Sequence, residues 1–355
     1  MAEQRLRIAT IPGDGIGTEV IPVGQAVADK VAARHGFSIE WKVFDWSCER
    51  YLETGRMMPE DGMAQLEPFD AIYLGAVGWP SVPDHVSLWG LLIPIRRQMQ
   101  QYANVRHVRL LKGIQSPLAN RTPEEIDFVV VRENVEGEYS EIGGRLNQGT
   151  PDELAVQEAV FTRKGCDRIM KYAFELAMKR PRRKVSSATK SNGIMHSMPF
   201  WDERFAAMAA EYPDVTTDQF HIDIMTAHFV RNPDWFDVVV ASNLFGDILS
   251  DLGPAVAGSI GIAPSSNLNP ERDYPSMFEP VHGSAPDIAG KGVANPVAAV
   301  WTVAEMLDFL GKSEAAAEVI SAMEAALAEP ATRTRDLGGT ADTKGAGEAI
   351  LAALG

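Results

Sequence analysis

The sequence predicts an α/β fold with a mostly parallel sheet, because short apolar strand segments alternate with amphipathic helical segments along most of its 355 residues. The chain opens with an apolar segment at 6–11, a glycine-rich turn, and a helical pattern at 18–36. The same alternation continues downstream. No internal repeat and no Ser/Gly-rich linker marks a boundary between domains.

The remaining elements follow from hydrophobic periodicity, turn residues and length. The expected strands are apolar and lie at 6–11, 38–44, 69–77, 105–111, 127–133, 184–190 and 236–242. The expected helices lie at 18–36, 59–66, 165–180, 198–211 and 246–257. The last hundred residues are rich in small residues and are expected to be mostly helical.

Length and composition indicate a globular protein with room for two domains, since 45% of the residues are hydrophobic and 23% are charged. No apolar stretch approaches the roughly 20 residues of a membrane span, and the first residues lack a signal-peptide pattern. We therefore expect a cytoplasmic protein without a membrane partner. A net charge of -15 also argues against nucleic-acid binding, because it repels phosphate backbones.

The glycine-rich turn IPGDGIG, residues 11–17, raises the question of a dinucleotide site. The fingerprint GxGxxG requires a glycine where this chain has Thr18, and Asp14 is a poor neighbour for a pyrophosphate. The spacing therefore favours a tight turn between strand and helix.

Four arginines indicate an anion site. Arg96 and Arg97 lie on a helical segment, Arg106 begins a strand, and Arg132 ends another. Strand ends in α/β folds are where ligands bind, and the arginine fork can bind a carboxylate through two hydrogen bonds. Converging arginines would make a dicarboxylate site, although for any one of them alone a surface ion pair is the favoured interpretation.

The segment NLFGDILSDLG places Asp247 and Asp251 one helical turn apart, so that two like charges share a face. A cation between them would offset their repulsion, and Mg²⁺ or Mn²⁺ prefers such oxygen ligands. Asp223, among apolar neighbours, is a candidate third ligand. The alternative is a solvated helical face. Lys190 at a strand end could act as a base and Tyr139 could donate a proton, although each could be structural.

Taken together, the motifs IPGDGIGTEV, IRRQMQQYANVR, VVVRENVEGEY, ATKSNG, NLFGDILSDLG and EPVHGSAPDIAGKGVANP resemble the isocitrate and isopropylmalate dehydrogenase family. The resemblance implies two interleaved α/β domains with an active-site cleft between them. One domain, at 1–103 and 255–355, would bind the cofactor. The other, at 104–254, would hold substrate and metal and form a homodimer.

The resemblance also implies a role for each candidate residue. Arg96, Arg106 and Arg132 would bind the carboxylates of a small hydroxyacid. The metal ligands for Mg²⁺ or Mn²⁺ would be Asp223, Asp247 and Asp251. Tyr139 and Lys190 would be the catalytic acid and base, and Lys190 and Asp223 would enter the site from the partner subunit.

The dinucleotide loop would then be HGSAPDIAGKGVANP, whose expected contacts are His282, Gly283, Ser284, Ala285, Pro286, Asp287, Ile288 and Asn295. A carboxylate at Asp287 can accept hydrogen bonds from the ribose hydroxyls of NAD but would repel the 2′-phosphate of NADP. Family members that use NADP carry lysine and tyrosine at the positions of Asp287 and Ile288. We therefore expect NAD.

The residues before Arg96 select the substrate in this family. Gly90 and Leu92 replace the serine and asparagine of isocitrate users, which disfavours isocitrate. The bulk of Trp89 is expected to shrink the pocket, and the segment is most similar to members that oxidise D-malate and tartrate. The alternatives are 3-isopropylmalate oxidation in leucine synthesis and, less favoured, a non-catalytic regulatory subunit.

Overall fold

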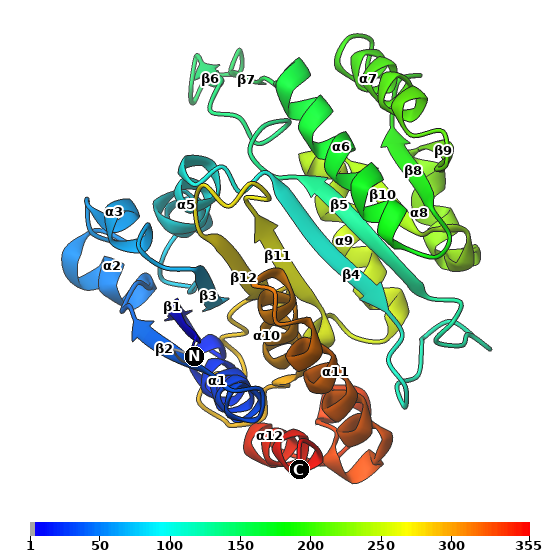
Figure 1. The fold of residues 1–355 in the computed structure, drawn as a ribbon. Coiled ribbons are helices and arrows are strands. Elements are labelled where there is room, and N and C mark those ends of the chain that lie inside the picture. The colour runs from blue at the N-terminus through cyan, green and yellow to red at the C-terminus, as the bar shows by residue number, and fades with distance from the viewer. Residues whose placement is uncertain (1–3) are drawn as a thin grey trace. The chain divides into compact units, whose positions relative to one another are not determined.

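The computed structural model describes residues 4–355 and divides by its internal contacts into two compact units. The first unit holds the described residues up to 101 together with 109–123 and 254–355, and the second holds 102–108 and 124–253. Each unit consists of strands covered by helices, which confirms the α/β class (Figure 1). The domain division expected from the sequence stays a prediction, and it differs from the contact units mainly in placing 109–123.

The strands of the first unit lie in the order β2-β1-β3-β12-β11. The pairs β1–β2, β1–β3 and β3–β12 are parallel, whereas β11 and β12 are antiparallel. The sheet is thus mostly parallel, as expected. The bounds of these strands are β1 (Gln4–Gly13), β2 (Phe37–Val43), β3 (Ala71–Ala76), β11 (Pro264–Leu268) and β12 (Ser276–Pro280).

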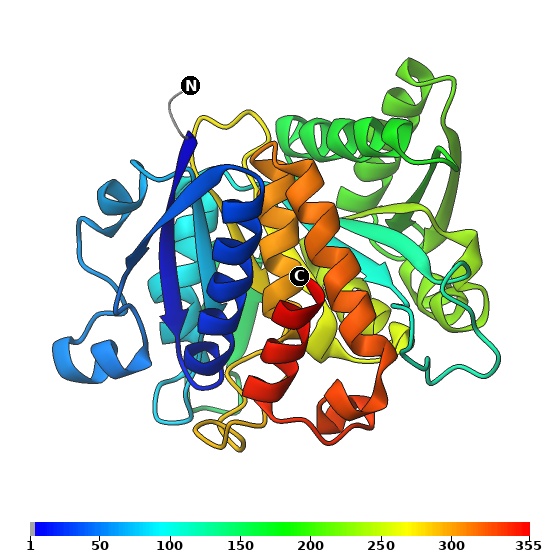
Figure 2. The same ribbon diagram turned by 60° about the horizontal axis from the view of Figure 1, so that its bottom comes forward.

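Four long helices of the first unit lie side by side in Figure 2: α1, α10, α11 and α12. Helix α10 is apolar on nearly all sides, and ten of its thirteen residues are buried between β-strands and neighbouring helices. The helices of this unit are α1 (Gly17–Arg34), α2 (Cys48–Thr54), α3 (Gly62–Leu66), α4 (Asp84–Ser87), α5 (Ile93–Gln98), α10 (Val297–Phe309), α11 (Ser313–Ala328) and α12 (Thr343–Ala353), with a π-helical turn at Leu88–Leu92 before α5.

The strands of the second unit lie in the order β4-β5-β10-β8-β9, and the pairs β5–β10, β8–β10 and β8–β9 are parallel. Its core includes the rings of Phe128, Phe229 and Phe236, with centroids 4.7–4.8 Å apart in two of the three pairs. The elements are β4 (Ala103–Arg109), β5 (Asp127–Glu133), α6 (Arg163–Lys179), β8 (Lys184–Thr189), α7 (Ser197–Glu211), β9 (Thr216–His221), α8 (Ile222–Arg231), β10 (Val238–Ala241) and α9 (Asn243–Ala257).

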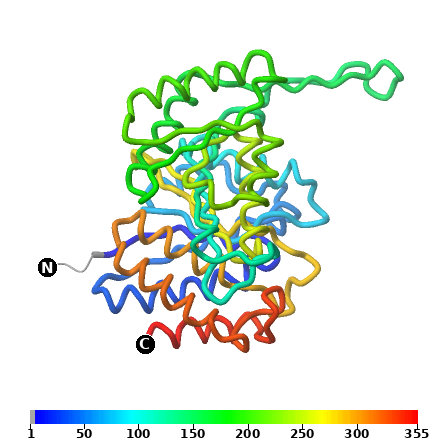
Figure 3. Tube along the Cα trace, turned by 90° about the vertical axis from the view of Figure 1, so that its right-hand side faces the viewer, coloured from blue at the N-terminus to red at the C-terminus, as the bar shows by residue number. Residues whose placement is uncertain are grey.

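A two-stranded hairpin, β6 (Gly143–Leu146) with β7 (Leu154–Gln157), projects from the second unit as an arm (Figure 3). Every residue of both strands is exposed. Four apolar side chains on the arm, those of Ile142, Leu146, Leu154 and Val156, are 45–62% exposed. The arm therefore has no packing partner within the described part of its own unit.

The structure confirms the strands and helices expected from hydrophobic periodicity, but it adds elements that were not expected, among them α2, α8, β9 and the β6–β7 hairpin. It also corrects one region. The last hundred residues begin with the strands β11 and β12 and become helical only from Val297. These strands contain buried Ser265, Ser266, Asn267 and Ser276 instead of β-branched residues. Asn267 donates to the Met277 carbonyl and to Glu279, and Ser276 accepts from the Asn269 N–H group. Because these buried residues are polar, the sequence carries no apolar strand pattern there. No helix among residues 4–355 is long and apolar enough to cross a membrane.

The IPGDGIG segment forms the tight turn that its spacing predicted, between the end of β1 and the start of α1. The Asp14 carboxylate accepts hydrogen bonds from the backbone N–H groups of Cys48 (2.8 Å) and Gly78 (2.9 Å). Gly15 has a φ of +55°, and a Cβ there would lie 2.1 Å from the carbonyl oxygen of Ser284. Two requirements therefore fix glycine at this position: a left-handed backbone and contact with a distant loop.

Gly15→Ala tests the second requirement, with Gly36→Ala as the matched control. Gly36 also has a positive φ, of +70°, but a Cβ there would meet nothing within 4 Å. Backbone strain alone costs about 1–2 kcal/mol. Urea denaturation should give that loss for Gly36→Ala and a loss larger by about 1–3 kcal/mol, from overpacking, for Gly15→Ala. Equal losses would show that the contact with Ser284 adds no constraint.

Candidate active site

Arg132 lies at the end of β5, where its side chain is almost fully buried. Its Nε and Nη2 atoms donate to the Oδ1 of Asn243 at 3.1 and 2.7 Å, and its Nη1 donates to Asp247. Gly246 allows this arrangement, because a Cβ there would lie 2.5 Å from the Arg132 Cβ. The glycine of NLFGD thus brings α9 into contact with the arginine.

Arg106 on β4 lies between the two aspartates of α9. Its Nη1 is 3.3 Å from an Asp251 oxygen, and its Nη2 is 3.9 Å from an Asp247 oxygen. Asn104 accepts from its Nε at 3.1 Å. Within the chain, arginines therefore offset the like charges of Asp247 and Asp251. The candidate substrate-binding residues Arg106 and Arg132 thus lie beside these two candidate metal ligands.

Tyr139 joins the same cluster. Its hydroxyl donates to the Oδ2 of Asp247 at 2.8 Å, and its ring lies 5.6 Å from the Arg132 guanidinium carbon. Desolvation, together with the negative charge and hydrogen bond of Asp247, raises the pKa of Tyr139 above its ordinary value, although Arg132 opposes the shift. The phenol therefore stays protonated at neutral pH, as a proton donor must.

Glu138 fixes the loop that carries Tyr139 to the start of α9. One carboxylate oxygen accepts from the Ser242 hydroxyl at 2.8 Å, and the other accepts from the backbone N–H of Leu244 at 3.0 Å. Neither contact could be expected from the sequence, because the partners are more than 100 residues away.

Lys190 and Asp223 form a separate pair, at the end of β8 and in the first turn of α8. The Nζ of Lys190 lies 2.5 Å from the Oδ1 of Asp223, and this hydrogen bond lowers the pKa of the aspartate. Among residues 4–355, no three acidic, histidine or cysteine side chains lie close enough to hold a metal. Within one chain, therefore, Asp223 does not join Asp247 and Asp251, and the three-aspartate site stays a prediction.

Arg96 belongs to the first unit, on α5. Its Nη2 lies 2.7 Å from the carboxylate of Glu279, and both side chains are largely buried. The same Glu279 oxygen accepts from the Asn267 side-chain amide at 2.8 Å. No sequence pattern points to Glu279, which orients this arginine from β12.

Trp89 stacks on a neighbouring cation, with its ring centroid 4.7 Å from the guanidinium carbon of Arg97. It also lines a cavity of about 580 Å³, together with Met57 and His85. Arg97 thus contacts a tryptophan of its own unit, and its expected part in an anion site stays a prediction. The expected effect of Trp89 on substrate size stays a prediction.

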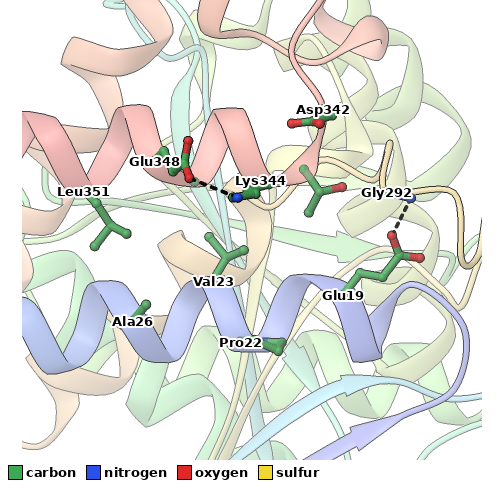
Figure 4. A pocket seen from close by; sticks show the side chains of 11 residues that line it. Glu19, Pro22, Val23, Ala26, Gly292, Asp342, Lys344, Glu348 and Leu351 are labelled. Atoms are coloured by element: carbon green, nitrogen blue, oxygen red, sulfur yellow. Dashed lines mark hydrogen bonds and ion pairs between the residues drawn. The ribbon is translucent and has the colours of Figure 1, made fainter.

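The loop at 282–296 in the first unit is held by Glu19 of α1, a residue to which no sequence pattern assigns this role. Its two carboxylate oxygens accept from the backbone N–H groups of Gly290 (2.6 Å) and Gly292 (2.9 Å), and Figure 4 shows the second of these contacts. Thr343 of α12 adds two hydrogen bonds to the backbone, from its N–H and its hydroxyl group. The loop is therefore held by side chains from both ends of the chain.

Several groups of this loop are available to a ligand. The Nε2 of His282 is buried without a hydrogen-bond partner, and desolvation lowers the pKa of this histidine. The side chain of Asp287 is exposed, and a Cβ at Gly283 would meet nothing within 4 Å. The buried Asn295 donates to Asp336 at 2.9 Å, a contact that the sequence did not predict.

Glu133 is a buried acid next to Arg132. Its carboxylate accepts from the N–H groups of Val135 (2.9 Å) and Glu136 (2.7 Å) and lies 3.1 Å from Arg168. Burial outweighs these favourable contacts and raises the pKa of Glu133 from 4.5 to about 7. Glu133 thus organises the start of the loop that leads to Tyr139.

This shift predicts a pH-dependent stability. Between about pH 4.5 and 7 the folded chain keeps a proton that the unfolded chain releases, so the Glu133 contribution to the free energy of unfolding falls as pH rises. In the wild type this shift should make the free energy of unfolding up to about 3 kcal/mol larger at pH 5 than at pH 8, at 1.4 kcal/mol per pKa unit. Glu133→Gln should remove that part of the pH dependence. Glu158→Gln, at an exposed position, is the control. An unchanged pH dependence in Glu133→Gln would contradict the shift.

Comparisons with known proteins agree with these motifs. The isocitrate/isopropylmalate dehydrogenase family model matches residues 7–350. The chain is 57% identical to D-malate dehydrogenase (decarboxylating) from Escherichia coli, over 97% of each chain. It is also 57% identical to tartrate dehydrogenase/decarboxylase from Pseudomonas putida, over 99% of this chain and 98% of the relative.

The fold is likewise shared with solved structures. Isocitrate dehydrogenase from Methylococcus capsulatus matches with a TM-score of 0.88 at 30% identity, over 98% of this chain and 99% of the other. Sequence motifs, full-length relatives and fold therefore agree, and the chain belongs to the isocitrate/isopropylmalate dehydrogenase family.

Proposed function

We propose that the protein catalyses the NAD-dependent and divalent-metal-dependent oxidation and oxidative decarboxylation of D-malate and tartrate. Family members are generally NAD(P)- and metal-dependent enzymes, and the relatives named above are decarboxylating dehydrogenases. The observation that carries the proposal is the cluster of Arg106, Arg132, Tyr139, Asp247 and Asp251 in the second unit. It combines anion-binding, metal-binding and proton-donating groups.

The substrate would be bound by Arg106 and Arg132 together with Arg96, each through a carboxylate oxygen. All three guanidinium groups are largely buried and already oriented by acidic or amide partners. Such orientation lowers the entropic cost of binding a small dianion. D-malate carries two carboxylates and little else, which suits a site built from charge instead of from apolar surface.

A divalent cation fits the aspartates chemically. Asp247 and Asp251 present only oxygen donors, from one face of a helix, as Mg²⁺ or Mn²⁺ prefers. In the proposal they hold the ion with Asp223, and the ion supplies a positive charge that stabilises developing negative charge on the substrate oxygens. Because Arg106 and Arg132 contact these aspartates, the residues that would hold the ion lie beside the residues that would bind the substrate carboxylates.

NAD fits the loop at 282–296. The unpartnered Nε2 of His282, the exposed Asp287 and the open backbone at Gly283 are groups that a dinucleotide could engage. In the proposal Asp287 accepts hydrogen bonds from the ribose hydroxyls, as inferred from the sequence. The other contacts are Ser284, Ala285, Pro286, Ile288 and Asn295.

The proton transfers follow from Lys190 and Tyr139. Lys190, as the neutral amine, would accept the proton of the substrate hydroxyl while the carbon that bears this hydroxyl loses a hydride. Bound NAD⁺ would supply the hydride acceptor, so that the alcohol is oxidised to a ketone. The resulting β-keto acid loses CO₂, with the electron pair of the broken bond forming an enolate. Tyr139 would then protonate the enolate carbon from which CO₂ was lost, giving pyruvate from D-malate.

A homodimer would complete the site, with Lys190 and Asp223 supplied by the partner subunit. Two observations support this proposal. Lys190 pairs with Asp223 instead of joining the Tyr139 cluster of its own chain. The arm at β6 and β7 also exposes apolar side chains that a second copy could cover.

Steady-state assays with D-malate, L-tartrate, meso-tartrate and 3-isopropylmalate, each with NAD or NADP and Mn²⁺, test the activity. We expect NADH formation with D-malate and tartrate, pyruvate and CO₂ from D-malate, and loss of activity on metal removal with EDTA. The kcat/KM for 3-isopropylmalate should be at least about tenfold lower, because its side group must be accommodated. Preference for 3-isopropylmalate would identify a leucine-pathway enzyme, and Mn²⁺ binding without turnover a regulatory subunit.

Subunit mixing tests the shared site. Tyr139→Phe and Lys190→Ala should each be nearly inactive alone, but a mixture refolded or coexpressed as heterodimers should recover activity. One site of each heterodimer would then hold both intact residues, and random pairing predicts about a quarter of wild-type activity. If Tyr139 and Lys190 of one chain serve the same site, every site stays defective and mixing restores nothing.

A further inference from the structure

Asn243, the first residue of α9, makes three side-chain hydrogen bonds although it lies outside the residues expected to be functional. Its Oδ1 accepts from the Nε and Nη2 of Arg132 at 3.1 and 2.7 Å. Its Nδ2 donates to the backbone carbonyl of Glu136 at 3.0 Å. The residue is only 3% exposed, so these partners replace water completely. One amide therefore links the candidate substrate arginine to the loop that carries Tyr139.

We propose that Asn243 is a positioning residue that sets both the orientation and the effective charge of Arg132. The inference rests on the proposed role of Arg132 as a ligand of the substrate carboxylate. Asn243 occupies the edge of the guanidinium formed by Nε and Nη2, which fixes the plane of the group. The substrate then meets an arginine whose rotation is already restricted.

The neutrality of the amide matters as much as its geometry. Arg132 already contacts the Asp247 carboxylate and also interacts with the charge of Asp251. A further carboxylate in place of the amide would add negative charge directly against this buried guanidinium, and the local field would weaken its attraction for a dianionic substrate. An amide oxygen accepts the same hydrogen bonds without that charge, so Arg132 keeps its attraction for an anion.

The backbone around Asn243 is fixed by contacts that do not involve its side chain. Glu138 binds the Ser242 hydroxyl and the Leu244 N–H, and the N–H of Gly246 donates to the carbonyl of Ser242 at 2.8 Å. Gly137 has a φ of +97°, and a Cβ at this position would lie 3.1 Å from the Cβ of Asn243. The absence of that Cβ leaves room for Asn243. Substitution of the amide should therefore alter the guanidinium more than the fold.

Asn243→Asp and Asn243→Ala separate charge from orientation. The readouts are KM for D-malate, the inhibition constant of succinate, KM for NAD, kcat and Tm. Succinate has the four-carbon dicarboxylate skeleton without an oxidisable hydroxyl group. We expect Asn243→Asp to raise KM for D-malate and the succinate constant by about tenfold or more, with KM for NAD changed less than twofold. Asn243→Ala should raise the same two constants by a smaller factor.

Asn120→Asp is the matched control, because it makes the same chemical change at an exposed loop position of the first unit. It should leave all five quantities near those of wild type. Asn243→Ser, which keeps a small polar side chain, provides a further variant if the others do not fold. Equal changes in the constants for D-malate, succinate and NAD would indicate general disruption and overturn the inference.

Arg132→Gln separates the substrate-binding role proposed for Arg132 from the positioning role proposed for Asn243. If it leaves the succinate constant unchanged, Arg132 does not bind the substrate, and both the proposed role of Arg132 and the inference fail. If Arg132→Gln weakens succinate binding but the folded Asn243 variants do not, the role of Arg132 stands and the positioning role of Asn243 is wrong.

Discussion

The second unit is organised by one electrostatic constraint: Asp247 and Asp251 lie one helical turn apart and need positive charge beside them. Arg106 and Arg132 supply it, from strands β4 and β5. Each neighbouring feature serves that arrangement. Gly246 removes the side chain that would separate α9 from Arg132, Glu138 fixes the helix start, and Tyr139 donates to the aspartate nearest the arginine.

Most of the fold was predictable because parallel strands in the core are apolar and their helices are amphipathic. The runs Phe128–Val131 and Val238–Ala241 carry that pattern clearly, and both are strands. Strand β11 escaped prediction because its buried residues Ser265, Ser266 and Asn267 are polar. The partners of Asn267 lie on β12, outside the local sequence. Composition reveals burial only where burial is driven by apolar side chains.

Some residues of the candidate site could likewise be predicted from the sequence, and others could not. Arginines, aspartates, Tyr139 and Lys190 could be chosen from the sequence because their chemistry suits an anion, a metal and a proton. Glu19, Glu138, Asn243 and Glu279 could not, because each acts on a partner more than 100 residues away. Residues that orient others have ordinary side chains, and their roles exist only in three dimensions.

The projecting hairpin has a consequence for the lifetime of a single chain. Two strands alone are marginally stable in water, and their outer edges offer unpaired backbone groups to any other strand. A chain without the proposed partner would present such edges together with four exposed apolar side chains. Dissociation of the proposed homodimer would therefore favour aggregation as well as reassociation. Assembly would then protect this part of the fold in addition to completing the proposed site.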